Sequence, residues 1–246
     1  MPNRSLHQAF RSLCRRPAFA LAAILTIALG AGANIAVFHI VYPVLLQPLP
    51  FRQPDRLVQI WESTPALPQL QVAVPDFEDW KRSTKSFEGL AAYTLQAMNK
   101  ITLLGQGEPE VLQGAMATEN LLPILGVQPL LGRWFSPEDQ REKRRVALLS
   151  EALWRRKFSA DPGVVGKNIR LEKESFTVIG ILRRGEAIPE WADLWIPFSL
   201  LEPELQNTRK YHPLEIIGRL RSGVSTDRAQ AEIQTISHGL SQAYPA

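Results

Sequence analysis

The sequence predicts an α+β protein, with one N-terminal transmembrane helix followed by a mixed α+β extracytoplasmic part that forms either one domain or two subdomains. Residues 17–51 contain no Asp, Glu, Lys or Arg, and a helix crosses a bilayer core with about 20 apolar residues. Beyond them, the expected strands and helices follow no regular βαβ rhythm, which favours α+β over a doubly wound sheet. The hydrophobic content of 45% is enough for a folded core.

Basic residues set the expected direction of the helix, because they favour the cytoplasmic side of a membrane. We therefore expect a cytoplasmic N-terminus and, beyond the helix, residues after position 47 outside the cytoplasm. Two interpretations of residues 1–16 remain. Leu6, Phe10 and Leu13 recur at helical spacing, which favours an amphipathic helix on the inner leaflet; the alternative is a basic flank without this structure. The topogenic residues are Arg4, Arg11, Arg15 and Arg16.

The apolar run leaves one alternative to a transmembrane helix over residues 17–46. A cleavable signal peptide could end at residues 31–33, which form an A-x-A-like site. Cleavage there would leave a second apolar run, residues 35–45, at the new N-terminus, whereas one continuous helix accounts for both halves. Cys14 precedes the run, so it is not a lipoprotein anchor, and we expect a reduced cytoplasmic thiol.

Small residues form a stripe along the expected helix. Ala28, Gly32 and Ala36 recur every four residues, a pattern that lets two membrane helices approach closely. Asn34 adds a side chain that can form hydrogen bonds between helices. An alanine-rich run can contain such a stripe by chance, but an isolated anchor has no need of one. We therefore expect these four residues to pack against a partner helix.

Prolines end this helix and lead into the extracytoplasmic part. Four of them predict an extended exit, namely Pro43, Pro48, Pro50 and Pro54. Residues 57–61 alternate as a first strand. After a proline-rich stretch over residues 65–75, we expect a helix with Asp76 as its N-cap and with Phe77 and Trp80 on one face.

The later elements are read from apolar periodicity and turn residues. Residues 89–117 predict strands joined by a turn at residues 105–107, and Gly126 ends a short helix over residues 119–125. A further helix presents Leu153, Trp154 and Phe158 to a core. The other expected elements are a turn at 161–163, strands over 145–149, 169–171, 176–182, 194–196 and 214–220, and helices over 150–158 and 226–243.

Charge and motifs exclude several functional classes. The net charge of +4 equals the four N-terminal arginines, so the remainder is formally neutral and no nucleic-acid surface is expected. Residues 163–168 lack the spacing and the Ser or Thr of a phosphate-binding loop. Neither a G-x-S-x-G motif nor a zinc-ligand spacing occurs. We therefore expect no enzyme, no metal and no cofactor, and structural or solvent-facing histidines at His7, His39, His212 and His238.

Many blocks of the chain resemble, in order, MacB/FtsX-like ABC transporter permeases, most closely their acidobacterial-type subgroup. Residues 11–34 resemble the first transmembrane helix of these permeases, and residues 45–57 resemble its exit from the membrane. Each later block is a weak motif alone, but so many in register are specific. These blocks are residues 75–80, 86–93, 107–110, 125–133, 161–166, 218–220 and 223–225.

The resemblance implies an architecture and a set of partners. Residues 47–246 would be a MacB-like periplasmic core domain, outside an inner membrane that further transmembrane helices also cross. A cytoplasmic ABC ATPase subunit would supply energy for export of substrates or for pulling on lipoproteins. The implied partners are the lipid bilayer, the other permease helices from the same or a second subunit, and this ATPase.

The end of the chain leaves two functional readings. Family members continue into more transmembrane helices where this chain stops at Ala246. We expect either the N-terminal part of a permease that couples the ATPase to the external domain, or a single-pass, membrane-anchored binding or interaction module without transport activity.

Overall fold

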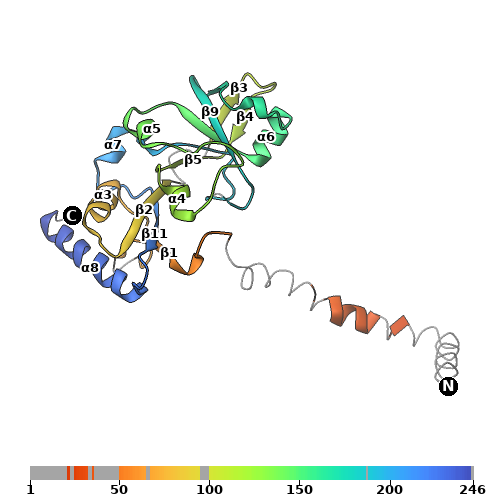
Figure 1. Ribbon diagram of the computed structural model, residues 1–246. Helices are drawn as coiled ribbons and strands as arrows, with labels where there is room; N and C mark the ends of the chain where they lie inside the picture. Colours follow the sequence, from red (N-terminus) through yellow and green to blue (C-terminus); the bar gives the residue numbers. More distant parts are fainter. Residues whose placement is uncertain are drawn as a thin grey trace. The chain divides into compact units, whose positions relative to one another are not determined.

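The computed structural model describes residues 21–22, 25–32, 35, 50–64, 67–94, 100–186 and 188–244. The chain forms two compact units, Met1–Leu49 and Pro50–Ala246. In the first unit, residues 25–32 are helical and exposed (Figure 1). Most of the expected transmembrane helix lies outside the described residues. Within the described ranges, no helix combines the length and the apolar composition that crossing a bilayer requires.

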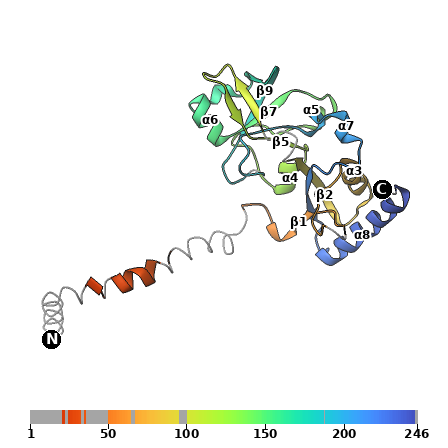
Figure 2. The same ribbon diagram turned by 180° about the vertical axis from the view of Figure 1, so that it is seen from behind.

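A mixed sheet organises the second unit (Figures 1 and 2). It has eleven strands in the order β1-β11-β2-β5-β10-β7-β9-β8-β3-β4, with β6 beside β9. The pairs β5 with β10 and β7 with β9 are parallel, and the other pairs are antiparallel. The strands are β1 Leu57–Ile60, β2 Phe87–Thr94, β3 Ile101–Leu104, β4 Glu110–Leu112, β5 Gly114–Ala117, β6 Leu131–Gly132, β7 Val146–Ser150, β8 Asn168–Leu171, β9 Glu174–Leu182, β10 Leu194–Pro197 and β11 Leu214–Leu220.

Helices are short, except at the C-terminal end. The α-helices are α3 Val74–Ser83, α4 Leu121–Leu125, α5 Pro137–Arg141, α6 Glu151–Phe158, α7 Pro203–Gln206 and α8 Thr226–Ala243. The described residues also form three 3₁₀-helices, namely η1 Pro54–Arg56, η2 Pro162–Val164 and η3 Phe198–Leu200. Ser136, Ser150 and Ser225 cap α5, α6 and α8 by accepting backbone hydrogen bonds through their hydroxyl oxygens.

The central strands are buried on both faces of the sheet. Successive side chains of a strand point to opposite faces. In β7, Ala147 and Leu149 join one buried cluster, whereas Val146 and Leu148 join another. The same alternation separates Leu194 and Ile196 of β10 from Trp195. The near-continuous apolar runs of these strands follow from this two-sided burial.

Different helices cover the two faces near β1, β11 and β2. Helices α3 and α8 pack on one face through Phe77, Trp80 and Ile233. Helix α4 packs on the other face through Leu121 and Leu125, together with Trp134 and Phe135. The sheet and its helices therefore form three layers at this end.

The structure confirms most of the expected elements but corrects the start of α3. Its N-cap is Ala73, and Pro75 lies in the first turn. Backbone N–H groups there have no acceptor within the helix, so a proline, which lacks this group, costs no hydrogen bond. Asp76 therefore lies inside the helix, and its carboxylate pairs with Arg209. The sequence did not predict β6, α5 and α7, because their two to five residues carry no apolar pattern.

Replacing Gly180 with Ala should destabilise the second unit. A Cβ at Gly180 would lie 2.7 Å from the carbonyl oxygen of Arg133 and 2.8 Å from that of Leu131, where β6 pairs with β9. We expect the free energy of unfolding of residues 50–246 to fall by about 2 kcal/mol in urea titrations, because backbone has to move. Gly239→Ala, on an exposed part of α8 with no atom near its Cβ, should instead stabilise by up to about 1 kcal/mol. Equal effects of the two changes would contradict this account.

Candidate functional site

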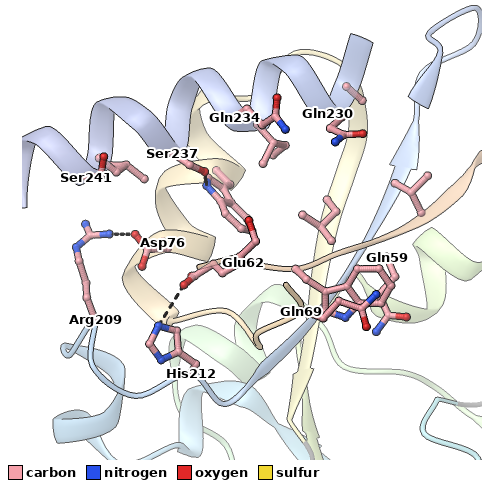
Figure 3. A pocket seen from close by; sticks show the side chains of 18 of the residues that line it. Gln59, Glu62, Gln69, Asp76, Arg209, His212, Gln230, Gln234, Ser237 and Ser241 are labelled. Atoms are coloured by element: carbon pink, nitrogen blue, oxygen red, sulfur yellow. Dashed lines mark hydrogen bonds and ion pairs between the residues drawn. The ribbon is translucent and has the colours of Figure 1, made fainter. Parts of the chain in front are cut away.

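A cleft opens on the face of the sheet that α3 and α8 cover. Its volume is about 880 Å³, and its walls come from β1, α3, α8 and residues 207–212 (Figure 3). The apolar wall includes Val58, Ile60, Trp61, Phe87, Ile233 and Leu240. Neutral polar side chains face it as well, namely Gln59, Gln69, Gln230, Gln234, Ser237 and Ser241. The cleft thus combines an apolar wall with many hydrogen-bonding groups.

Glu62 is the most perturbed acid in the cleft. It follows β1, and its two carboxylate oxygens lie 3.1 Å from the backbone N–H of Ala73 and 3.1 Å from Nε2 of His212. Burial raises the pKa of Glu62 to about 7, and the negative charge of Asp76 adds to this, whereas the Ala73 N–H and Arg209 act in the opposite direction. The carboxylate therefore changes its charge near neutral pH.

Arg209 holds Asp76 of the cleft and the neighbouring Asp79 of α3. Its guanidinium pairs with Asp76 and lies 2.6 Å from Oδ2 of Asp79, while the Tyr244 ring centre is 4.1 Å from its central carbon. Burial raises the pKa of Asp76 in spite of this pairing. Burial also favours the neutral form of Asp79, but hydrogen bonds from Arg209 and Arg82 outweigh it and lower the pKa of Asp79. These ion pairs tie α3 to the segment before β11.

A second polar arrangement lies on the opposite face of the sheet, where the second unit begins. We call residues 50–56 the junction segment, because they connect the first unit to β1. Arg219 of β11 is 1% exposed. Its guanidinium donates hydrogen bonds to the backbone oxygens of Ile124 at 2.7 Å, Arg52 at 2.6 Å and Gln53 at 3.3 Å. One buried cation therefore joins the junction segment, α4 and β11.

Other contacts hold the junction segment at the same place. The Arg52 N–H donates to the Leu125 oxygen at 3.1 Å, and Arg56 donates from Nε to the Leu220 oxygen at 3.0 Å. Gly126 ends α4 with φ +75°, and a Cβ there would lie 2.5 Å from the Arg52 Cβ. A glycine is needed at this position both for its backbone conformation and for the close approach.

The structure gathers residues that the sequence reasoning did not select. Glu62, Arg209 and Arg219 are distant in sequence from their partners, so no local spacing marks them. Ala28 and Gly32 lie in the helical residues 25–32, exposed, with no atom within 4 Å of a Cβ at Gly32. Asn34, Ala36, Arg4, Arg11, Arg15 and Arg16 lie outside the described residues. The packing and topogenic roles of all eight therefore stay predictions.

Paired charges and neutral hydrogen-bonding groups determine the chemistry of the cleft. Its acids and its arginine pair with one another or with His212. Over the part of the chain that the structure describes, no group of three or more His, Cys, Asp or Glu side chains is arranged to hold a metal ion. The cleft suits an amphipathic ligand or a segment of a partner.

Comparisons with known proteins agree on a family. The sequence model of the MacB-like periplasmic core domain matches residues 20–236. The macrolide export ATP-binding/permease protein MacB of Neisseria gonorrhoeae is 25% identical over 127 residues, 49% of this chain and 19% of that protein. The match thus spans about a fifth of that relative.

Solved structures share the fold. The periplasmic region of MacB from Actinobacillus actinomycetemcomitans superposes with a TM-score of 0.59 at 14% identity, covering 76% of this chain and 84% of that one. A domain of a putative permease from Porphyromonas gingivalis gives 0.59 at 21% identity, with 76% and 86% covered. The α+β class that the sequence predicts is thereby confirmed.

Replacing Glu62 with Gln should flatten the pH dependence of stability. Because the pKa is about 7 in the folded protein and lower in the unfolded chain, the folded state binds this proton more tightly. The resulting stabilisation is complete below about pH 4.5 and is lost as the pH rises through about 7. Urea titrations of residues 50–246 give the free energy of unfolding at pH 5 and at pH 8. The difference between these two values should be about 2 kcal/mol smaller in Glu62→Gln than in the wild type.

The control for Glu62→Gln makes the same change at the exposed Glu108, in the turn between β3 and β4. In this control, the change in the free energy of unfolding between pH 5 and pH 8 should be the same as in the wild type. An unchanged difference in Glu62→Gln would show that burial does not perturb this carboxyl.

Proposed function

Since the chain belongs to the MacB-like periplasmic core domain family, we propose that it is the N-terminal part of a membrane-embedded permease in an ABC-type export or mechanotransmission system. Its task is to couple a cytoplasmic ATPase to the extracytoplasmic domain, by conformational change and without catalysis of its own. The family match over residues 20–236 carries this proposal, because it begins inside the expected transmembrane helix and continues through the sheet into α8.

The proposed topology follows from the sequence. The four N-terminal arginines keep the N-terminus in the cytoplasm, residues 17–46 cross the inner membrane, and residues 47–246 fold in the periplasm. The partners are the lipid bilayer, further permease helices from the same or a second subunit, and the ABC ATPase. The contacts of the junction segment with β11 and α4 support coupling, because they connect the start of the second unit to its sheet.

Association with an ATPase tests this proposal directly. The full chain, solubilised in detergent, should co-purify with an ATPase encoded beside it that carries a phosphate-binding loop, and the adjacent DNA should encode further hydrophobic segments. If neither an ATPase nor such segments are found, the transporter proposal fails for this chain.

Gly32→Leu should weaken assembly with partner helices, because a large side chain separates helices that pack through small residues. We expect the amount of co-purified partner to fall at least fivefold, equivalent to about 1 kcal/mol, with an unchanged melting temperature of the periplasmic domain. Gly30→Leu makes the same change two residues away, on another side of the expected helix. Equal recovery of partner in all three proteins would count against the packing stripe.

The cleft favours a second candidate function, that of a membrane-anchored extracytoplasmic binding module. Its volume of about 880 Å³ lies in the range of roughly 300–1,000 Å³ typical of small-molecule sites. Its apolar wall and hydrogen-bonding groups suit an amphipathic molecule. This function and the permease function are compatible in one protein, but only the permease requires an ATPase.

A fluorescent probe tests the cleft. The dye 1-anilinonaphthalene-8-sulfonate should bind residues 50–246 with an affinity that falls at least tenfold in Gln234→Trp, because the indole would occupy the cleft. Gln242→Trp, also on the exposed side of α8 but outside the cleft, should bind the dye like the wild type. Equal binding by the three proteins would remove the cleft as a ligand site.

A further inference from the structure

Arg219 is a buried cation whose hydrogen bonds all go to backbone oxygens. Among the described residues, no carboxylate forms an ion pair with it. Burial, reinforced by the positive charges of Arg52 and Arg56, lowers its pKa. A buried charge without an ionic partner is costly, and an apolar side chain often stabilises a core better. Stability alone is thus a weak reason for an arginine at this position.

The bonds of Arg219 point to a mechanical role. Two of its three acceptors, the oxygens of Arg52 and Gln53, belong to the junction segment. Arg56 makes the reciprocal contact, from the junction segment to the Leu220 oxygen of β11. Bonds to backbone oxygens hold the path of the chain and do not depend on the side chains of the segment. The two arginines therefore bind the junction segment to one strand from both directions.

The position of β11 determines where a displacement would go. This strand lies between β1 and β2, with four register pairs to β1 and seven to β2. The third acceptor of Arg219, the Ile124 oxygen, lies in α4, which packs on the same face of the sheet. A pull on the junction segment is therefore shared between a central strand and a helix and is not confined to the edge strand β1.

We infer that Arg219 is a positioning residue that fastens the junction segment to β11, so that displacement of the chain before residue 50 moves the sheet as one body. This inference rests on the proposed coupling function, since it names the residue through which the coupling enters the periplasmic domain. Without Arg219, the junction segment would detach first, and the displacement would be lost in extending it.

Force spectroscopy on the full chain tests this inference. The protein is held in a lipid nanodisc with Cys14→Ser, and handles are attached through Pro50→Cys and Lys173→Cys, both exposed positions of the second unit. The wild type should extend only when the domain itself unfolds. Arg219→Met should add an earlier extension of about 2 nm, the length of a detached segment of seven residues, while the force of domain unfolding stays unchanged.

The matched control is Arg221→Met. Arg221 follows β11 and also donates to a backbone oxygen, that of Lys85 at 2.9 Å, but among the described residues it forms no hydrogen bond with the junction segment. It should behave like the wild type. Absence of the early extension in Arg219→Met, or a lower domain-unfolding force without that extension, would overturn the inference, since either result leaves Arg219 with a packing role only.

A second pair of variants approaches the same contact from the junction segment. Gln53 has φ +46°, which proline cannot adopt and glycine adopts readily. Gln53→Pro should therefore move the Arg52 and Gln53 oxygens away from Arg219 and produce the early extension, whereas Gln53→Gly should not. If Arg219→Met does not fold, this pair decides the question, and identical traces for Gln53→Pro and wild type overturn the inference.

The force experiment and the co-purification experiment test the two proposals independently. The force measurement requires no ATPase and no transport, so it reports on the contact alone. An early extension in Arg219→Met with no ATPase partner in co-purification would refute the permease proposal and leave the fastening contact established. Co-purification of the ATPase with no early extension would retain the permease and exclude Arg219 as its coupling residue.

Discussion

Burial of both faces of one mixed sheet is the constraint on which the rest of the second unit depends. Its central strands β7 and β10 leave little room for polar chemistry, because most of their side chains enter one of two apolar clusters. The cleft and the junction segment both lie at the end of the sheet formed by β1, β11 and β2.

Strand β11 connects these two places. Residues 209–212 of the cleft precede it, with Arg209 bound to α3 and His212 beside Glu62. Near its other end, Arg219 reaches the opposite face and holds the junction segment. The segment before β11 thus lines the cleft, and β11 itself holds the junction segment. This arrangement gives the proposed coupling a defined structural path.

Family and fold are established at different levels of detail. The family match covers most of the chain, whereas the structural neighbours share 14% and 21% of their residues and so support the fold alone. A fold with so little sequence in common is maintained by patterns of burial and not by particular residues.

The sequence by itself predicted the features that depend on neighbouring residues along the chain. Apolar periodicity placed the longer strands and helices, Gly126 marked the end of α4, and the absence of charge over residues 17–51 predicted a membrane segment. Only the tertiary structure decided the strand order, the start of α3 at Val74 and the groups around Glu62, Arg209 and Arg219. Arg219 and its partners Arg52 and Gln53 stand more than 160 positions apart. Burial of a cation and its pairing with distant backbone oxygens are properties of the folded sheet, and no spacing along one chain encodes them.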